Sequence, residues 1–298
     1  TIGLCGKWGS GKTSILNMVE EYIQNQTKEY EDTSKPIIIH FNPWNYSDRS
    51  QLTVQFFQTI LTELKGSPNS TALKQAGDAL QRYSSILEYA ELIPIAGKYF
   101  RLLKSITNEF GKDLSNLAES ENSLERQKAE VIEALESQNQ KLIVIIDDID
   151  RLNNKQIRLI FQLVNSLAGF PNMIYLLSFD RDVVVRALND EQNCNGAEYL
   201  EKIIQVPFDI PEVQISLVHQ VFFSQLEQLL FHERSCNNFE KEYWDRVFRH
   251  CISPFIKGLR DVNRIMNIYR FKYGLMHDET NCIDLLALTT FQICAPSI

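Results

Sequence analysis

The chain has 298 residues, of which 44% are hydrophobic and 23% charged, and its formal net charge at pH 7 is −8. This length and composition suit one large α/β domain with a smaller second domain. The negative net charge argues against a protein whose whole surface binds nucleic acid. It leaves room for a local basic patch. The sequence has no signal peptide and no uninterrupted apolar run of membrane-spanning length.

The cysteines and histidines show no ligand spacing. Six cysteines are scattered without a C-x-x-C pair, and the five histidines share no regular interval. In a chain of this length, the pattern predicts reduced thiols in a cytoplasmic protein and neither a disulfide framework nor a zinc site. The chain also starts directly at an apolar run that leads into a motif, so we expect it to be a domain of a longer protein.

That motif spans Gly6 to Thr13, which read G-K-W-G-S-G-K-T and match the full G-x-x-x-x-G-K-[ST] pattern. An apolar run, residues 1–5, precedes it and an amphipathic segment follows from Ser14, as a phosphate-binding loop between a strand and a helix requires. Two of its glycines can adopt backbone angles that turn successive N–H groups toward an anion. The following helix adds the positive end of its dipole.

In such a loop, Lys12 reaches the β- and γ-phosphates and the Thr13 hydroxyl binds Mg²⁺. The sequence therefore predicts a site for a nucleoside triphosphate and magnesium. The residues expected to bind the phosphates are Gly9, Ser10, Gly11, Lys12, Thr13 and Ser14.

Helix and strand patterns alternate after the loop. Residues 15–23 repeat apolar side chains at helical spacing, and residues 37–41 form an apolar run typical of a strand buried on both faces. Residues 42–46 are an aromatic turn, either a packed corner or a wall beside the nucleotide or a neighbouring subunit. Residues 52–64 predict a further amphipathic helix.

Residues 67–140 differ from the rest because they lack strand-like runs and are rich in Gln, Lys, Glu, Ser and Asn. We expect an inserted helical layer here. Its most apolar part, residues 86–106, carries charged side chains at five positions, which favours an amphipathic helix over a membrane span. Residues 119–137 are charged and predict a solvated helix that leads back into the core.

A second motif begins at residues 142–146, an apolar run followed by Asp147 and Asp148. A buried parallel strand would deliver these acids to the edge of the sheet where open α/β proteins bind ligands. Asp147 is then placed to hold Mg²⁺ through its water shell, and Asp148 to orient or deprotonate the attacking water. Alternatively, these acids only cap the next helix. Arg151 either forms an ion pair at the edge of the core or reaches a neighbouring subunit's nucleotide as an arginine finger.

Residues 157–167 predict a helix, and residues 173–179 predict a fourth strand beside the strand that carries the acids. At its tip, Ser178 and Asp180 are candidates to sense the γ-phosphate, and helix capping is the alternative for Asp180. Residues 203–208 predict a fifth strand, and their proline, Pro207, indicates either an edge of the sheet or the end of a strand.

Beyond residue 211 the pattern is helical to the end, and residues 283–293 are so apolar that we expect them to be buried. Arg260 and Arg264 lie one helical turn apart in this region. Arg264 would bend down onto the phosphates from a lid and make closure depend on nucleotide. The alternative is a solvated basic face.

Taken together, these motifs resemble the KAP P-loop NTPases of the additional-strand class, and the resemblance covers nearly the whole chain. Lys7 departs from the acidic residue expected before the tryptophan. The segments that carry the likeness are Ile2–Ser14 with its tryptophan loop, Phe41–Trp44, Ile146–Arg151 with its D-D-x-D-R, Phe179–Asp180, Arg260–Arg264 and Leu285–Leu288.

The resemblance implies a parallel sheet in which the phosphate-loop strand lies next to the fourth strand, together with an α-helical lid. It also implies ATP hydrolysis coupled to assembly or signalling. Bacterial relatives are often linked to antiviral defence and animal relatives to membrane signalling scaffolds. Many members carry transmembrane helices between the two nucleotide motifs, but the charged insertion here argues against membrane integration.

The sequence thus predicts an α/β P-loop NTPase with a five-stranded parallel sheet, whose core spans residues 1–211 with a helical insertion at 67–140 and whose lid spans residues 212–298. The expected cofactors are ATP and Mg²⁺. The expected partners are further copies of the chain and an effector protein or fused effector domain, with no direct nucleic-acid signature. The residues assigned to catalysis are Lys12, Asp148, Arg151 and Arg264, with Thr13 and Asp147 at the metal and Asp180 near the phosphates.

Two alternatives to an ATPase remain. The chain could be a nucleotide-gated assembly module, in which ATP is a structural ligand and turnover is low. It could also be a small-molecule kinase, although paired acids at the end of the metal-binding strand suit water activation better.

Overall fold

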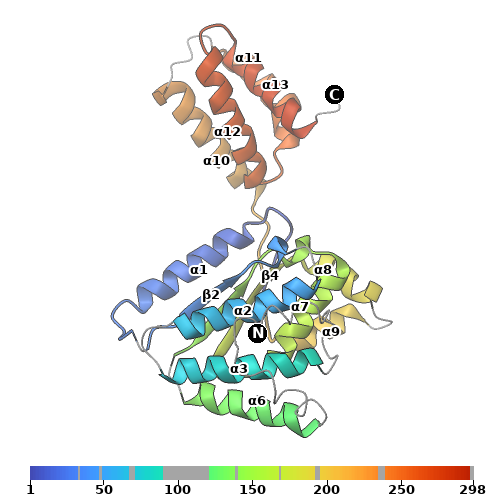
Figure 1. The fold of residues 1–298 in the computed structure, drawn as a ribbon. Helices are drawn as coiled ribbons and strands as arrows, with labels where there is room; N and C mark the ends of the chain where they lie inside the picture. The colour runs from blue at the N-terminus through green and yellow to red at the C-terminus, as the bar shows by residue number, and fades with distance from the viewer. Residues whose placement is uncertain are drawn as a thin grey trace. The chain divides into compact units, whose positions relative to one another are not determined.

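Short apolar runs form the five strands of a parallel sheet in the computed structural model (Figure 1). The structure describes residues 1–32, 34–46, 49–66, 71–89, 121–137, 140–167, 169–191, 195–233 and 239–295. The strands are β1 (Ile2–Cys5), β2 (Ile37–Phe41), β3 (Leu142–Ile146), β4 (Met173–Phe179) and β5 (Val206–Asp209). Their order in the sheet is β2-β3-β4-β1-β5, and all neighbours are parallel.

The strand order fixes where the two motifs meet. β4 pairs with β1 on one side and with β3 on the other, so Leu4 lies opposite Ser178 and Ile146 lies opposite Leu177. The predicted position of the phosphate-loop strand next to the fourth strand is confirmed. Because all strands are parallel, the loops after β1, β3 and β4 emerge at the same edge of the sheet.

The fifth strand starts later than the sequence predicts. Ile203 is the last residue of helix α9 (Gly196–Ile203), and it is buried together with Ile204, so the apolar run at 203–208 is shared between a helix end and a strand. β5 itself lies at the edge, and all four of its residues are exposed. Pro207 is tolerated there because an edge strand can lack one N–H donor.

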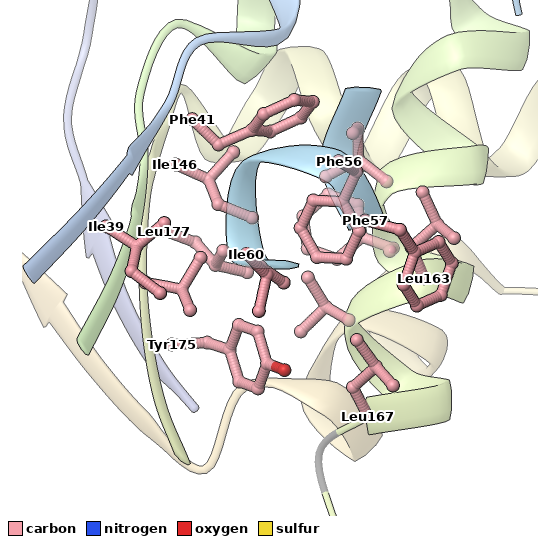
Figure 2. Packing of buried hydrophobic residues seen from close by; sticks show 14 of the residues in the cluster. Ile39, Phe41, Phe56, Phe57, Ile60, Ile146, Leu163, Leu167, Tyr175 and Leu177 are labelled. Carbon is pink, nitrogen blue, oxygen red and sulfur yellow. The ribbon is translucent and has the colours of Figure 1, made fainter. Parts of the chain in front are cut away.

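Helices cover both faces of the sheet. On one face, α1 (Lys12–Gln26) packs on alternate strand residues, including Leu4, Ile143 and Ile145. The opposite face carries the larger core, to which α2 (Arg49–Gly66) and α7 (Asn154–Leu167) contribute (Figure 2). The side chains labelled there are Ile39, Phe41, Phe56, Phe57, Ile60, Ile146, Leu163, Leu167, Tyr175 and Leu177. Strands buried on both faces have few polar positions, which explains their continuous apolar sequence.

The inserted region contributes two described helices, α3 (Thr71–Tyr89) and α6 (Glu121–Glu136), which pack against each other. The predicted solvated helix at 119–137 is wrong in part. Val131 and Leu135 of α6 are fully buried because they lie four residues apart on one helical face. Most of the segment at 86–106 lies outside the described residues. Within the described part of the chain, no helix is long and apolar enough to cross a membrane.

The chain divides into two compact units, one of Thr1–Lys7 with Gly11–Ile210 and a second of Trp8–Ser10 with Pro211–Ile298. The first unit also contains helices α8 (Arg181–Glu191) and α9. The second contains α10 (Ile215–Glu227), α11 (Lys241–Val247), α12 (Leu259–Met276) and α13 (Cys282–Cys294) around its own core. The expectation that residues 283–293 are buried holds for most of them, but Leu288 is 64% exposed because it lies on the outer face of α13.

The cysteines depart from the expected uniform reduced state. Cys5, Cys251 and Cys294 are free thiols, whereas Cys282 is disulfide-bonded. Sequence spacing did not indicate this bond because a disulfide needs two cysteines close together in space and no particular interval in the chain. Cys194 and Cys236 lie outside the described residues.

Candidate functional site

The loop between β1 and α1 has the backbone conformation that an anion-binding loop requires. Gly9 and Gly11 have φ angles of 86° and 91°, in the left-handed region that favours glycine. Gly11 is the N-cap of α1, and its carbonyl accepts a hydrogen bond from the N–H of Ile15 at 3.0 Å. The first N–H groups of α1 have no acceptor within the helix, so they are available to a bound anion.

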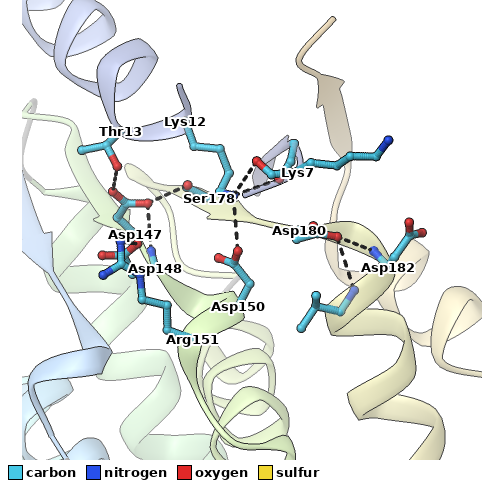
Figure 3. Close-up of polar contacts among 12 residues, drawn as sticks. Lys7, Lys12, Thr13, Asp147, Asp148, Asp150, Arg151, Ser178, Asp180 and Asp182 are labelled. Atoms are coloured by element: carbon cyan, nitrogen blue, oxygen red, sulfur yellow. Dashed lines mark hydrogen bonds and ion pairs between the residues drawn. The ribbon is translucent and has the colours of Figure 1, made fainter. Parts of the chain in front are cut away.

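Lys12 begins α1, and its side chain lies across the end of β1. Its ammonium Nζ donates to the carbonyl oxygens of Gly6 at 2.9 Å and Lys7 at 3.4 Å (Figure 3). It also forms an ion pair with Oδ2 of Asp150 at 3.3 Å. Both side chains of this pair are only 7% exposed. A charge this deeply buried requires such partners because transfer out of water is costly.

Thr13 and Asp147 meet directly at the end of β3. The Thr13 hydroxyl donates to Oδ2 of Asp147 at 2.7 Å, although the two residues are far apart in sequence. The other carboxylate oxygen accepts from the Ser178 hydroxyl at 2.7 Å and from the N–H of Asp148 at 2.8 Å. The predicted convergence of the phosphate loop with the acids of the second motif is therefore found. This donor set consists of hard oxygen atoms, and it fits Mg²⁺.

Ser178 is fully buried in β4. In the structure it fixes the orientation of the Asp147 carboxylate, and a role in sensing the γ-phosphate stays a prediction. Asp180, the other candidate at this strand end, accepts hydrogen bonds from the N–H groups of Asp182 at 3.0 Å and Val183 at 3.4 Å. It thus caps α8, the alternative that the sequence left open, and its predicted contact with phosphate also stays a prediction.

Asp148 has a left-handed backbone conformation, with φ 60° and ψ 30°. Its Oδ1 forms an ion pair with Nη2 of Arg151 at 2.7 Å, and its Oδ2 accepts from the Asn42 amide at 3.5 Å. Burial raises the pKa of the Asp148 carboxyl, the neighbouring Asp147 raises it further, and Arg151 opposes the rise. A raised pKa suits a carboxylate that accepts a proton from water.

Arg151 therefore takes the first of its two predicted roles, an ion pair at the edge of the core, and its side chain remains 43% exposed. A role as an arginine finger stays a prediction. Arg264 lies on α12 in the second unit, and its contact with phosphate stays a prediction as well. Within the aromatic turn, Pro43 is buried and Tyr46 stacks on Phe41, as in a packed corner, whereas Trp44 is exposed.

Sequence reasoning assigned no role to Asn42 or Asp150, yet both contact the charged residues of the site. Asp150 lies in the 3-10 turn Ile149–Arg151, and the side chains of its neighbours Ile149 and Leu152 are buried. An acid at such a position indicates a partner cation nearby. Asn42 directly follows β2 and begins the aromatic turn. Only the strand order shows that β2 lies beside β3, and hence that Asn42 lies near Asp148.

These features define the class of the protein. In this parallel sheet, β1 leads through a glycine loop into α1, and β4 separates β1 from the acid-bearing β3. This arrangement is that of a P-loop NTPase with an additional strand. The model of the KAP family P-loop domain matches residues 1–275. The chain belongs to the KAP family.

A curated relative in Escherichia coli (strain K12) is named "Phage T7 exclusion protein". The two sequences are 25% identical over 320 aligned residues, which cover 100% of this chain and 42% of the relative. The chain therefore spans less than half the length of that relative.

Proposed function

We propose that this domain binds and hydrolyses ATP with Mg²⁺. The observation that carries the proposal is the 2.7 Å contact between the Thr13 hydroxyl and the Asp147 carboxylate, since it joins the phosphate loop to the acid-bearing strand. This contact supports the proposal, because two oxygen atoms suited to one divalent cation then lie near backbone N–H groups suited to phosphate.

Each residue then has a separate task. Thr13 and Asp147 hold the metal, which neutralises phosphate charge when bound. Lys12 contacts the β- and γ-phosphates, and the N–H groups from Gly9 to Thr13 surround them. Asp148 orients the attacking water and takes its proton. Ser178 keeps the Asp147 carboxylate in one orientation through its hydrogen bond.

One observation favours the second candidate, a nucleotide-gated assembly module with little turnover. Asp148 is held by Arg151 at 2.7 Å, so its carboxylate is already engaged in this conformation. If that ion pair persists with nucleotide bound, Arg151 continues to lower the proton affinity of the carboxylate, and Asp148 would be a weaker base for the water. ATP would then act mainly as a structural ligand that controls contacts with further copies of the chain.

Two measurements separate the candidates. One is the steady-state release of inorganic phosphate, and the other is the size of the protein on gel filtration with and without Mg²⁺-ATP. We expect continuous phosphate release that is abolished in Lys12→Ala. A nucleotide-dependent increase in size with no more than stoichiometric phosphate release would favour the assembly module. Unchanged nucleotide affinity in Lys12→Ala would contradict both.

We further propose that the nucleotide state controls an effector in defence against bacteriophage, in the cytoplasm. The support is the name of the relative, a phage exclusion protein, together with the match over the whole of this chain. Plating of phage T7 on cells that express the complete protein tests it. We expect fewer plaques than with Lys12→Ala, and equal plaque numbers would contradict a defence role against this phage.

A further inference from the structure

The Lys12 ammonium already makes three polar contacts within the protein itself. Its partners are two carbonyl oxygens of its own loop, on Gly6 and Lys7, and the Asp150 carboxylate (Figure 3). An ammonium group has three N–H donors. Contact with a phosphate therefore requires Lys12 to give up or share at least one of these partners.

Asp150 is the charged partner in this set, and it is held in place by its own element. The 3-10 turn Ile149–Arg151 follows the left-handed Asp148, and Ile149 is fully buried in the core. The turn is also closed by hydrogen bonds from the N–H of Arg151 to the Asp148 carbonyl and from the N–H of Leu152 to the Ile149 carbonyl, each at 3.2 Å. Lys12 has a flexible four-carbon stem, so the lysine is the partner that moves.

Burial of the Asp150 carboxylate at this position costs free energy of folding. Its Oδ2 contacts Lys12, whereas its Oδ1 is buried without a hydrogen-bond partner among the described residues. A buried carboxylate with one unsatisfied oxygen does not improve folding by itself, and its net contribution depends on the cation beside it. Its presence is therefore best explained by an effect on Lys12.

We propose that Asp150 is an internal counter-ion that holds Lys12 in the empty site and competes with the nucleotide phosphates for it. This inference rests on the proposed nucleotide site. Nucleotide binding exchanges the Asp150 carboxylate for a phosphate as the main anionic partner of Lys12. The carboxylate thereby lowers the affinity for nucleotide and keeps Lys12 paired with an opposite charge in the empty site. Asp150 acts through Lys12 and is a positioning residue.

The first test compares ADP affinity in wild type, Asp150→Asn and Asp148→Asn by calorimetric titration without Mg²⁺. Asp148→Asn is the matched control, because it removes the same charge from the same motif but does not touch Lys12. We expect Asp150→Asn to bind ADP roughly tenfold more tightly than wild type, because the variant removes one buried charge that competes for Lys12. The gain in the control should be clearly smaller. Equal gains, or weaker binding in Asp150→Asn, would overturn the proposal.

A double-mutant cycle with Lys12→Met tests the pairing without nucleotide. In wild type, Asp150→Asn removes the partner of a buried cation, so the melting temperature should fall. In Lys12→Met, the same change removes a buried anion that has lost its cation, so the melting temperature should rise. The same sign in both backgrounds would contradict the pairing. A wild-type protein that binds no nucleotide would defeat the proposed function but leave this cycle interpretable.

Discussion

Three aspartates within four residues illustrate how neighbours decide chemistry at the scale of single residues. Asp147 accepts hydrogen bonds from two hydroxyls, Asp148 pairs with Arg151, and Asp150 pairs with the phosphate-loop lysine. The side chains are identical, so their different roles come from partners and burial. The sequence predicted that Asp147 and Asp148 serve the site, because they directly follow an apolar strand. The role of Asp150 depends on a turn geometry that spacing does not show.

Asp148→Asn should separate binding from turnover. The amide keeps the size of the carboxylate but cannot accept a proton from water, so ATP affinity should stay within a few-fold while kcat falls by roughly 10²–10⁴. Calorimetric titration and phosphate release measure the two quantities. Equal losses in affinity and turnover would contradict the role of Asp148 as the base.

The pH dependence of kcat/KM, which reports the groups of the free protein, should reflect the environment of Asp148. Because burial and Asp147 raise the pKa of this carboxyl, it binds a proton at higher pH than an exposed aspartate, and activity should fall on the acid side earlier than for an ordinary carboxylate. Arg151→Ala removes the cation that opposes this rise, so the acid limb should move to still higher pH. Arg151→Lys keeps the charge and is the control. An acid limb that moves to lower pH in Arg151→Ala would be inconsistent with this account.

At the scale of helices and strands, sequence periodicity predicted most of the fold but not its boundaries. The apolar runs of β2, β3 and β4 were recognised because strands buried on both faces have few polar positions. The start of β5 was placed too early because an apolar helix end and an apolar strand look alike. The buried face of α6 was missed because charged residues dominate its sequence.

Gly196 provides a test of packing between α8 and α9. A Cβ atom at this position would lie 2.6 Å from the Val185 carbonyl oxygen and 2.9 Å from Cβ of Leu188. Gly196→Ala should therefore destabilise the protein by about 1–3 kcal/mol through overpacking. Gly169→Ala is the control, since a Cβ there meets nothing within 4 Å. Chemical denaturation measures both, and equal stabilities of the two variants would contradict the described packing.

At the scale of the whole molecule, each of the two units has its own hydrophobic core. The membership in the KAP family was predictable because its motifs are spread over nearly the entire sequence, and the family match over residues 1–275 bears it out. The disulfide at Cys282 was not predictable from spacing. An oligomer and an effector leave no comparable local pattern in one chain, so both stay predictions.

Assembly should follow the nucleotide state. We expect the complete protein to form a larger species with Mg²⁺-ATP, and Asp148→Asn to retain that species for longer because it cannot hydrolyse the nucleotide. Light scattering coupled to gel filtration measures the mass, and Lys12→Ala should remain at the mass of the nucleotide-free protein. A mass that is independent of nucleotide in all three proteins would contradict nucleotide-controlled assembly.

The central claim is that the phosphate loop and the end of β3 hold one metal–nucleotide complex. Electron paramagnetic resonance of Mn²⁺, used in place of Mg²⁺, tests it most directly. We predict that wild-type protein with ATP binds Mn²⁺ in a complex whose signal differs from that of Mn²⁺-ATP alone, and that Asp147→Asn and Thr13→Ala each weaken this binding by at least roughly tenfold. Mn²⁺ binding with ATP that is unchanged in both variants would contradict the account.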